Sequence, residues 1–190
     1  MQPSSYIRMN SGRKFYFDDI QRNVIHVTDI ANGLAASARF GGQMDLDKFY
    51  SIAEHCINVS YFVPPEFAFC GLMHDAAEAI MGDMVTPLKN LSPDFKKMER
   101  EIDSYIAWRF GYQYPFPTAV KQVDFDMFIT EYHTVFKNRL INFPGEEDVA
   151  EFENCIPKYQ GQVKFHFYNP QDAYTAFLKR YLELTEFFGD

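Results

Sequence analysis

The sequence predicts an all-α fold, a bundle of helices with a small β-hairpin near the N-terminus. Apolar residues recur at helical spacing over most of the 190 residues, and Gly or Pro separates the periodic segments. A pattern typical of strands is confined to one short stretch near the start of the chain. At this length we expect a single domain over residues 1–190, with a core large enough to need no disulfides.

The N-terminal half contains the expected hairpin and three expected helices. The stretch YIRMNSGRKFYF (residues 6–17) has β-rich flanks around Asn-Ser-Gly, which is typical of a hairpin. Apolar spacing then predicts a short helix over residues 29–40 and a longer one over residues 47–63. Pro64-Pro65 ends the longer helix and opens another, which we expect to run to Gly82 because glycine commonly stops a helix.

Three further helices are expected in the C-terminal half. The first covers residues 92–111, where Ser92 is suited to the N-cap and is followed by proline at the first helical position. The second covers residues 117–136, and the third begins at Asn169-Pro170 and extends to about residue 188. Residues 140–163 are mixed and polar, and they predict no definite element.

Composition narrows the class of protein. The three cysteines (Cys56, Cys70 and Cys155) form no CxxC pair, and two of them fall on apolar helical faces, so we expect reduced thiols. A net charge of −8 argues against a nucleic-acid polymer as partner. The chain lacks a leader-like N-terminus and any apolar run of the ~20 residues that span a bilayer. We therefore expect a cytoplasmic protein (host cytoplasm if phage-encoded) with no membrane partner.

Ionisable residues interrupt three apolar helical segments. His74, Asp75 and Glu78 lie within FAFCGLMHDAAEAIMGD, where an uncompensated charge would be costly. At ~100° per residue, His74 and Glu78 point in nearly the same direction. His55 and Asp124 occupy similar apolar surroundings in two other helices. Two His and two Asp form a plausible N/O ligand set for a divalent metal. The alternative is that each His is a hydrogen-bonded core residue and each Asp faces solvent.

The order of these residues resembles a known family. His55, His74-Asp75 and Asp124 reproduce the H…HD…D order of the HD-domain metal-dependent phosphohydrolases. HDAAEAIMGDMVTPLK resembles the HD-x-x-E-x-x-x-G-D-x-x-x-P-x-K stretch of the branch that contains bacterial 5′-deoxynucleotidases and phage dNTP triphosphohydrolases. VKQVDFDMFITE is similar to the V-K-x-A-D-x-x-x-x-x-T-E pattern of that branch, with Val123 in place of Ala. The resemblance covers residues 6–131 and implies an HD-domain helical bundle.

The resemblance implies a metal centre and a proton carrier. His55, His74, Asp75 and Asp124 would bind one divalent cation, and Glu78 would act as the general acid or base. A ligand set of two nitrogens and two oxygens suits Co, Mn, Fe or Zn better than Mg, which prefers oxygen ligands and is the less suited candidate.

The resemblance also implies substrate contacts. Arg39 would hold phosphate, Phe40 would pack near the sugar or base, and Asp83 would contact the sugar. Lys89 and Lys121 would meet a polyphosphate, or they are solvated surface lysines. Arg39 could instead be a partner of a helix C-terminus, and Asp83 a simple turn residue. Two departures from phage-type relatives, Gln43 and Asn32 where many have His, bear on substrate choice.

The expected activity is metal-dependent hydrolysis of the 5′ phosphoester of 2′-deoxynucleotides, which releases deoxynucleoside plus phosphate or triphosphate. A dATP-type triphosphohydrolase is the preferred version, with a dNMP 5′-nucleotidase and a non-catalytic nucleotide-sensing module as alternatives. A purely structural helical protein is the remaining alternative. We expect a homo-oligomer, and the aromatic segments at 112–117 and 164–170 are either subunit interfaces or core.

Overall fold

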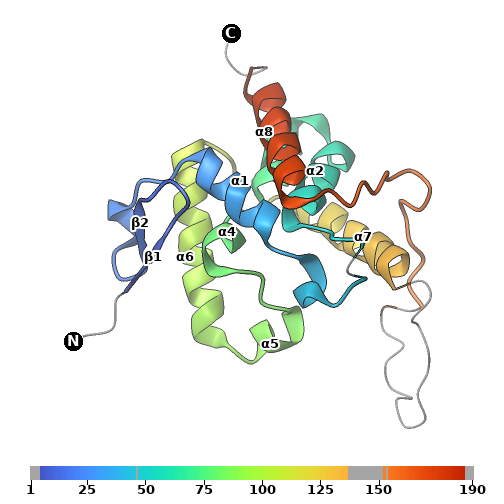
Figure 1. The fold of residues 1–190 in the computed structure, drawn as a ribbon, viewed down its shortest axis with the longest axis horizontal. Helices are drawn as coiled ribbons and strands as arrows, with labels where there is room; N and C mark the ends of the chain where they lie inside the picture. Colours follow the sequence, from blue (N-terminus) through green and yellow to red (C-terminus); the bar gives the residue numbers. More distant parts are fainter. Residues whose placement is uncertain (1–4, 46, 137–151, 153, 187–190) are drawn as a thin grey trace.

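The computed structural model describes residues 5–45, 47–136, 152 and 154–186, and these residues form a helical bundle with a two-stranded hairpin at one side (Figure 1). This confirms the all-α class predicted from the sequence. In chain order the elements are β1 (Tyr6–Arg8), β2 (Lys14–Tyr16), η1 (Ile20–Arg22), α1 (Val27–Ala36), η2 (Arg39–Gly42), α2 (Ile52–Phe62), η3 (Pro65–Phe67), α3 (Ala68–Met73), α4 (Glu78–Met81), α5 (Thr86–Asn90), α6 (Pro93–Phe110), α7 (Thr118–Val135) and α8 (Pro170–Glu186).

The hairpin confirms the prediction for residues 6–17. Its strands pair antiparallel with Ile7 opposite Phe15, and the turn between them contains Gly12 at a φ of 84°. Phe15 is fully buried in the main core, so the hairpin is attached to the bundle through this ring. Figure 1 shows the hairpin on the side of α6 that faces away from α7.

Helix α2 is the central element of the bundle. It packs against α1, α3, α7 and α8, and its residues from Ile52 to Ser60 are buried on every side. A helix buried all round is normally apolar, yet α2 carries Glu54, His55 and Asn58. These polar residues therefore need internal partners, and the contacts described below supply them.

Close packing of α1 against α4 fixes the position of Glu78, the first residue of α4. At Gly33 on α1, an added Cβ would lie 2.3 Å from the carbonyl oxygen of Ala79. Only glycine allows the two backbones to approach this closely.

The helix predicted over residues 29–40 ends earlier, at Ala36, so that part of the prediction is wrong. Ser37 leaves the helix in an extended conformation while its hydroxyl donates to the Gly33 carbonyl at 2.8 Å. The following backbone pairs with the segment that precedes α2, since Arg39 N donates to Tyr50 O at 2.9 Å and Ile52 N to Ser37 O at 3.0 Å. These long-range bonds place Arg39 outside the helix.

The helix predicted over residues 47–63 begins later, at Ile52. Ser51 is its N-cap, because the Ser51 hydroxyl accepts a hydrogen bond from Glu54 N at 3.1 Å. The sequence contains this Ser-x-x-Glu start signal, but the apolar residues before it extend the periodic pattern backward. The early start was therefore wrong for residues 47–51.

The continuous helix predicted from Pro65 to Gly82 was also wrong, because η3, α3 and α4 follow one another with a turn over residues 74–77. In this turn Ala76 N donates to Met73 O and Glu78 N to Asp75 O, both three residues back. Such bonding winds the chain at about 3 residues per turn. Glu78 therefore lies on the same side as Asp75 rather than directly beneath His74, which differs from the α-helical expectation.

The C-terminal helices α6, α7 and α8 confirm the three predicted there, although the last two residues expected for the final helix (187–188) lie outside the described residues. Gly111 ends α6 in the left-handed conformation, at a φ of 75°. Ser92 occupies the N-cap position of α6 without a side-chain cap bond. Part of the unassigned stretch 140–163 also lies outside the described residues.

Three remaining expectations concern the cysteines, the aromatic segments and membranes. Cys56 and Cys70 are buried free thiols, as predicted. Phe165 and Phe167 pack on the buried ring of Tyr50, so this part of the second aromatic segment lies against the core. Across the described ranges, no helix combines the length and apolar character that crossing a membrane requires. The single-domain assignment and the homo-oligomer stay predictions.

Candidate metal centre

Four side chains predicted as metal ligands converge from three parts of the fold. His55 comes from α2, His74 and Asp75 from the turn between α3 and α4, and Asp124 from α7. Asp124 Oδ1 lies 3.1 Å from His55 Nε2 and 3.5 Å from His74 Nε2. Asp75 approaches the same two nitrogens at 3.6 and 3.3 Å. His55, His74 and Asp75 offer ligand atoms within 4.8 Å of one another.

Hydrogen bonds on the far side of each imidazole fix its tautomer. His74 Nδ1 lies 2.8 Å from the carbonyl oxygen of Gly71, which can only accept, so Nδ1 carries the proton. His55 Nδ1 lies 2.6 Å from the Glu131 carboxylate, which holds the proton on this nitrogen in the same way. Both Nε2 lone pairs then face the centre of the cluster. This is the usual arrangement of metal-binding histidines.

The cluster fits a divalent cation. The two Nε2 atoms lie only 3.2 Å apart with their lone pairs facing, and two carboxylates approach the same point. Without a cation or an added proton, these groups repel one another in a buried site. Hydrogen-bonded core histidines would explain the Nδ1 contacts, but they would need an added proton at the facing Nε2 atoms. Nitrogen and oxygen donors in equal number suit a transition-metal ion.

Glu78 lies beside the cluster without belonging to it. The residue is 8% exposed, and burial, together with the neighbouring carboxylates of Asp75 and Asp83, raises the pKa of Glu78 well above its usual value. Lys89 Nζ lies 3.4 Å from Glu78 Oε1, while Glu78 Oε2 has no hydrogen-bond partner within the described part of the chain. A buried carboxyl with a free oxygen and a raised pKa is suited to proton transfer.

Arg39 reaches the cluster from the η2 segment. Its guanidinium donates to Glu131 Oε2 at 3.1 Å and lies 3.9 Å from Asp75 Oδ2, and its side chain is 12% exposed. The Arg39 Nε has no hydrogen-bond partner among the residues that the structure describes. A positively charged side chain at the edge of the candidate ligand cluster is well placed to contact an anionic group there.

Phe40 follows Arg39 in a strained backbone conformation. Its φ of 56° is unusual for a residue with a Cβ and costs on the order of 1 to 3 kcal/mol. The Phe40 ring packs against Phe128 and Phe136, with centroids 6.0 and 5.3 Å away. The aromatic wall formed by these three rings is therefore adjacent to the Arg39 side of the cluster.

The other predicted substrate contacts differ in their surroundings. Asp83 follows the left-handed Gly82 and is partly buried; burial raises the pKa of Asp83, whereas Arg39 opposes the shift. Lys89 lies 2.6 Å from Glu99 Oε1 in addition to its contact with Glu78, so its ammonium has internal carboxylate partners. Lys121 is exposed on α7 and has no ion pair with a described residue.

Sequence reasoning assigned no role to two buried residues that join this site. Glu131 is fully buried and contacts both His55 and Arg39, and Tyr50 donates to Glu131 at 2.6 Å. Glu131 lies seven residues after Asp124, and two turns of a helix place such residues on the same face. That spacing in VKQVDFDMFITE is the signal that could have identified Glu131.

Asp103 on α6 is a buried acid whose pKa is affected by the carboxylate of Asp75 in the site. Asp103 is 9% exposed, and burial together with Glu99 and Asp75 raises the pKa of its carboxyl to about 8. From about pH 4, the pKa of Asp in an unfolded chain, to pH 8, the folded state keeps a proton that the unfolded state has released. The contribution of Asp103 to the free energy of unfolding should therefore fall as the pH rises through this window.

Asp103→Asn is expected to remove this penalty. At pH 8 the variant should be more stable than the parent by on the order of 2 kcal/mol, because the amide is neutral at all pH values. Below pH 4 the two proteins should unfold alike, since the aspartate is protonated in both states. Thermal unfolding followed by circular dichroism at both pH values checks this, and an unchanged or lower Tm at pH 8 would contradict it.

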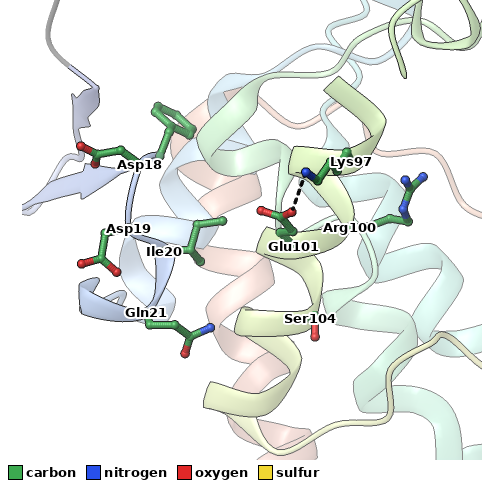
Figure 2. Close-up of a pocket in the computed structure, with 9 residues that line it drawn as sticks. Asp18, Asp19, Ile20, Gln21, Lys97, Arg100, Glu101 and Ser104 are labelled. Atoms are coloured by element: carbon green, nitrogen blue, oxygen red, sulfur yellow. Dashed lines mark ion pairs between the residues drawn. The ribbon is translucent and has the colours of Figure 1, made fainter. Parts of the chain in front are cut away.

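A surface cavity elsewhere is unrelated to this cluster. It has a volume of about 620 Å³ and lies between residues 17–21 and α6, as Figure 2 shows. Asp18 and Asp19 line one side, Lys97 and Arg100 line the other, and Lys97 pairs with Glu101 at 4.0 Å. None of the predicted ligands lines this cavity. Its charges are mixed and exposed, so it indicates no particular ligand.

Comparisons with known proteins identify similar sequences. The family described as 5′-deoxynucleotidase YfbR-like matches residues 49–110, a range that includes His55, His74, Asp75 and Glu78. The chain is 38% identical over 184 residues to the uncharacterized protein YfdR of Escherichia coli (strain K12), covering 96% of this chain and 97% of YfdR. It is 32% identical over 123 residues to the uncharacterized protein RCAP_rcc00048 of Rhodobacter capsulatus, covering 60% and 63% of the two chains.

These similarities bear on the expected substrate. The matching family carries the name of a deoxynucleotidase, and the two curated relatives are uncharacterized. None of the three descriptions mentions a triphosphate, so the preference for dATP draws no support from them.

Proposed function

Because the chain belongs to the YfbR-like family of HD-domain phosphohydrolases, we propose that it hydrolyses the 5′ phosphoester of 2′-deoxynucleoside monophosphates to deoxynucleoside and phosphate. Family membership makes the protein a metal-dependent phosphoric ester hydrolase; the monophosphate substrate and the residue roles are the proposal. The observation that carries it is the convergence of His55, His74, Asp75 and Asp124, with both Nε2 atoms directed at one point.

These four residues would hold the cation through two Nε2 atoms and two carboxylates. When bound, a divalent ion supplies a Lewis acid for the phosphoryl oxygens and lowers the pKa of a coordinated water. The protein contributes the orientation of the ligands, since Gly71 and Glu131 fix the imidazoles from behind. Removal of metal by a chelator should abolish turnover.

Glu78 would hold and move the proton in the reaction. Burial and the neighbouring carboxylates raise the pKa of Glu78, which favours the protonated carboxyl, so Glu78 can donate to the 5′ oxygen as the phosphoester bond breaks. The oxygen without a partner, Oε2, is the atom available for this transfer. The Lys89 contact on Oε1 holds the carboxyl in place during the step.

Arg39 and Phe40 would bind the nucleotide on the side of the cluster next to α7. The Arg39 guanidinium would pair with phosphate oxygens and stabilise the charge that develops on them. Phe40, with the aromatic wall behind it, would pack against the sugar or base, and Asp83 would accept a hydrogen bond from the sugar. All three lie next to the cluster or contribute to its electrostatics.

Triphosphohydrolase activity, including the dATP-specific form, is the rival proposal. Lys121 favours it, because this exposed lysine lies three residues before Asp124, about one turn earlier on the same helix, where it could meet a polyphosphate. Lys89 supports the triphosphohydrolase less, since Glu99 at 2.6 Å already pairs with its charge. A nucleotide-sensing module is the other rival, although a sensor has no use for the proton carrier at Glu78.

A substrate screen separates these proposals. Purified protein with Co²⁺ or Mn²⁺ would be incubated with each dNMP, NMP and dNTP, and the products separated by ion-exchange chromatography. Release of phosphate from dNMPs supports the proposal, whereas release of intact triphosphate from dNTPs supports the rival. Tight nucleotide binding without any product would support the sensing module. Absence of turnover with every substrate and both metals would overturn the proposed activity.

A further inference from the structure

We propose that Glu131 is the positioning residue of the metal centre, holding His55 with one carboxylate oxygen and Arg39 with the other. A single buried carboxylate thereby orients a metal ligand and the cation that faces the substrate phosphate. This inference rests on the metal site of the proposed function, and it adds a residue that acts on metal and phosphate through its neighbours.

The contacts divide cleanly between the two oxygens. Oε1 of Glu131 accepts from His55 Nδ1 and from the Tyr50 hydroxyl, each at 2.6 Å. Oε2 accepts from the Arg39 guanidinium at 3.1 Å. Glu131 has no exposed surface, so bulk solvent does not reach these bonds. A buried carboxylate is tolerated when strong donors surround it, and here two of the three donors belong to the candidate site.

A neighbouring amide fixes the direction of the Tyr50 hydrogen bond. Asn58 Nδ2 donates to the Tyr50 oxygen at 3.0 Å, so the hydroxyl proton is free to point at Glu131. Because Oε1 already accepts from this hydroxyl, its position is fixed independently of His55. The chain of bonds from Asn58 through Tyr50 to Glu131 therefore gives the His55 imidazole a rigid acceptor.

The acceptor at Nδ1 of His55 determines whether the other ring nitrogen, Nε2, is available to a metal. While Oε1 accepts from Nδ1–H, the Nε2 lone pair is exposed to His74 and Asp124 and available to a metal. If this acceptor is lost or replaced by a donor, His55 can adopt the other tautomer, in which Nε2 carries the proton. A protonated Nε2 cannot coordinate a metal.

Glu131→Gln tests this directly, because the amide keeps the size of the side chain. One orientation places the amide NH₂ against the Arg39 guanidinium, and the other places it against His55 Nδ1–H. One contact is therefore lost outright, and the other is weakened because its acceptor no longer carries a charge. The affinity for Co²⁺ should fall about 10- to 100-fold, as is typical for groups that support metal ligands. The visible absorption spectrum of the Co²⁺ protein should change as well, because the His55 ligand is displaced.

Glu54→Gln provides the matched control. Glu54 is also a buried glutamate, next to His55 on α2, but its carboxylate accepts from the backbone N–H groups of residues 166–168. This variant should lower Tm while leaving Co²⁺ affinity and the spectrum unchanged. An equal loss of Co²⁺ affinity in both variants would mean that Glu131 has only a structural role, and would overturn the inference.

The contact between Glu131 and Arg39 is tested separately, by inhibition with inorganic phosphate. In the Glu131→Gln variant loaded with Co²⁺, inorganic phosphate should inhibit about tenfold more weakly, which corresponds to the loss of about one charge-assisted hydrogen bond. An inhibition constant equal to that of the parent protein would overturn the proposal that Glu131 positions Arg39.

Tyr50→Phe is a second variant that tests the same role of Glu131, and it can be used if Glu131→Gln does not fold. The ring remains, but the second donor to Oε1 is lost, so Glu131 is held less firmly and Co²⁺ affinity should fall by about threefold, less than the loss typical of a removed supporting group. Unchanged Co²⁺ binding in a folded Tyr50→Phe protein would overturn the inference. Failure of the parent protein itself to bind Co²⁺ would instead refute the metal site, and with it both proposals.

Discussion

Asp124→Ala is expected to abolish tight binding of a divalent cation and, with it, hydrolysis of deoxynucleotides. Asp124 is the predicted ligand whose Oδ1 alone lies close to both imidazoles, 3.1 Å from His55 Nε2 and 3.5 Å from His74 Nε2. It also comes from α7, a different element from His55 and the His74-Asp75 pair. The loss should exceed the ~100-fold that removal of a supporting group can produce, because a direct ligand disappears.

Asp126→Ala is the matched control for this variant. Asp126 lies two residues further along α7 and pairs with Lys158 at 2.7 Å, away from the cluster. Isothermal titration with Co²⁺ or Mn²⁺, together with the deoxynucleotidase assay, should show a severe defect in Asp124→Ala and near-normal values in Asp126→Ala. Retention of metal stoichiometry and affinity by a folded Asp124→Ala protein would remove Asp124 from the ligand set.

The convergence of the four predicted ligands could be anticipated because the signal is local. His55, His74, Asp75 and Asp124 each interrupt an apolar stretch, and charged or polar residues in such places need compensation. The helices that carry His55 and Asp124 also follow ordinary apolar periodicity. This apolar setting left hydrogen-bonded core histidines as an alternative, and the resemblance to the H…HD…D order of the HD-domain family favoured the ligand set.

The helix boundaries near the site depended on contacts that periodicity does not contain. Ser37 and Ala38 leave the helical conformation because their backbone pairs with residues 50–52. The turn at residues 74–77 is wound more tightly than an α-helix, which places Glu78 beside Asp75. Neither feature changes the hydrophobic pattern, so the sequence alone predicted uninterrupted helices in both places.

The sequence also did not predict the burial of two carboxylates, Glu54 and Glu131. Each is satisfied by groups far away in the chain: Glu54 by the backbone of residues 166–168, and Glu131 by Tyr50, Arg39 and His55. A sequence reader sees a glutamate in a helix, for which solvent exposure is the ordinary expectation. Only the fold shows that one anchors a loop and the other supports the candidate metal centre.

Glu78→Gln is expected to retain metal binding while turnover falls about 10²- to 10⁴-fold, the range that a general acid or base contributes. The amide preserves the shape of the side chain and its contact distance to Lys89, and Glu78 is not among the four converging ligands. Binding of Co²⁺ should therefore match that of the parent protein. The rate should fall because the amide protons of glutamine are not acidic enough to be transferred to the leaving 5′ oxygen.

The pH dependence of this variant distinguishes proton donation from a structural role. Burial and the carboxylates of Asp75 and Asp83 raise the pKa of Glu78, so the protonated acid persists to higher pH than in an ordinary glutamate and is lost as the pH rises through that pKa. The parent protein should therefore lose kcat on the alkaline side, and Glu78→Gln should lack this limb of the profile. Glu54→Gln, the same exchange at a buried glutamate outside the cluster, should keep it. Normal kcat in Glu78→Gln, or an unchanged alkaline limb, would assign the proton transfer to another group.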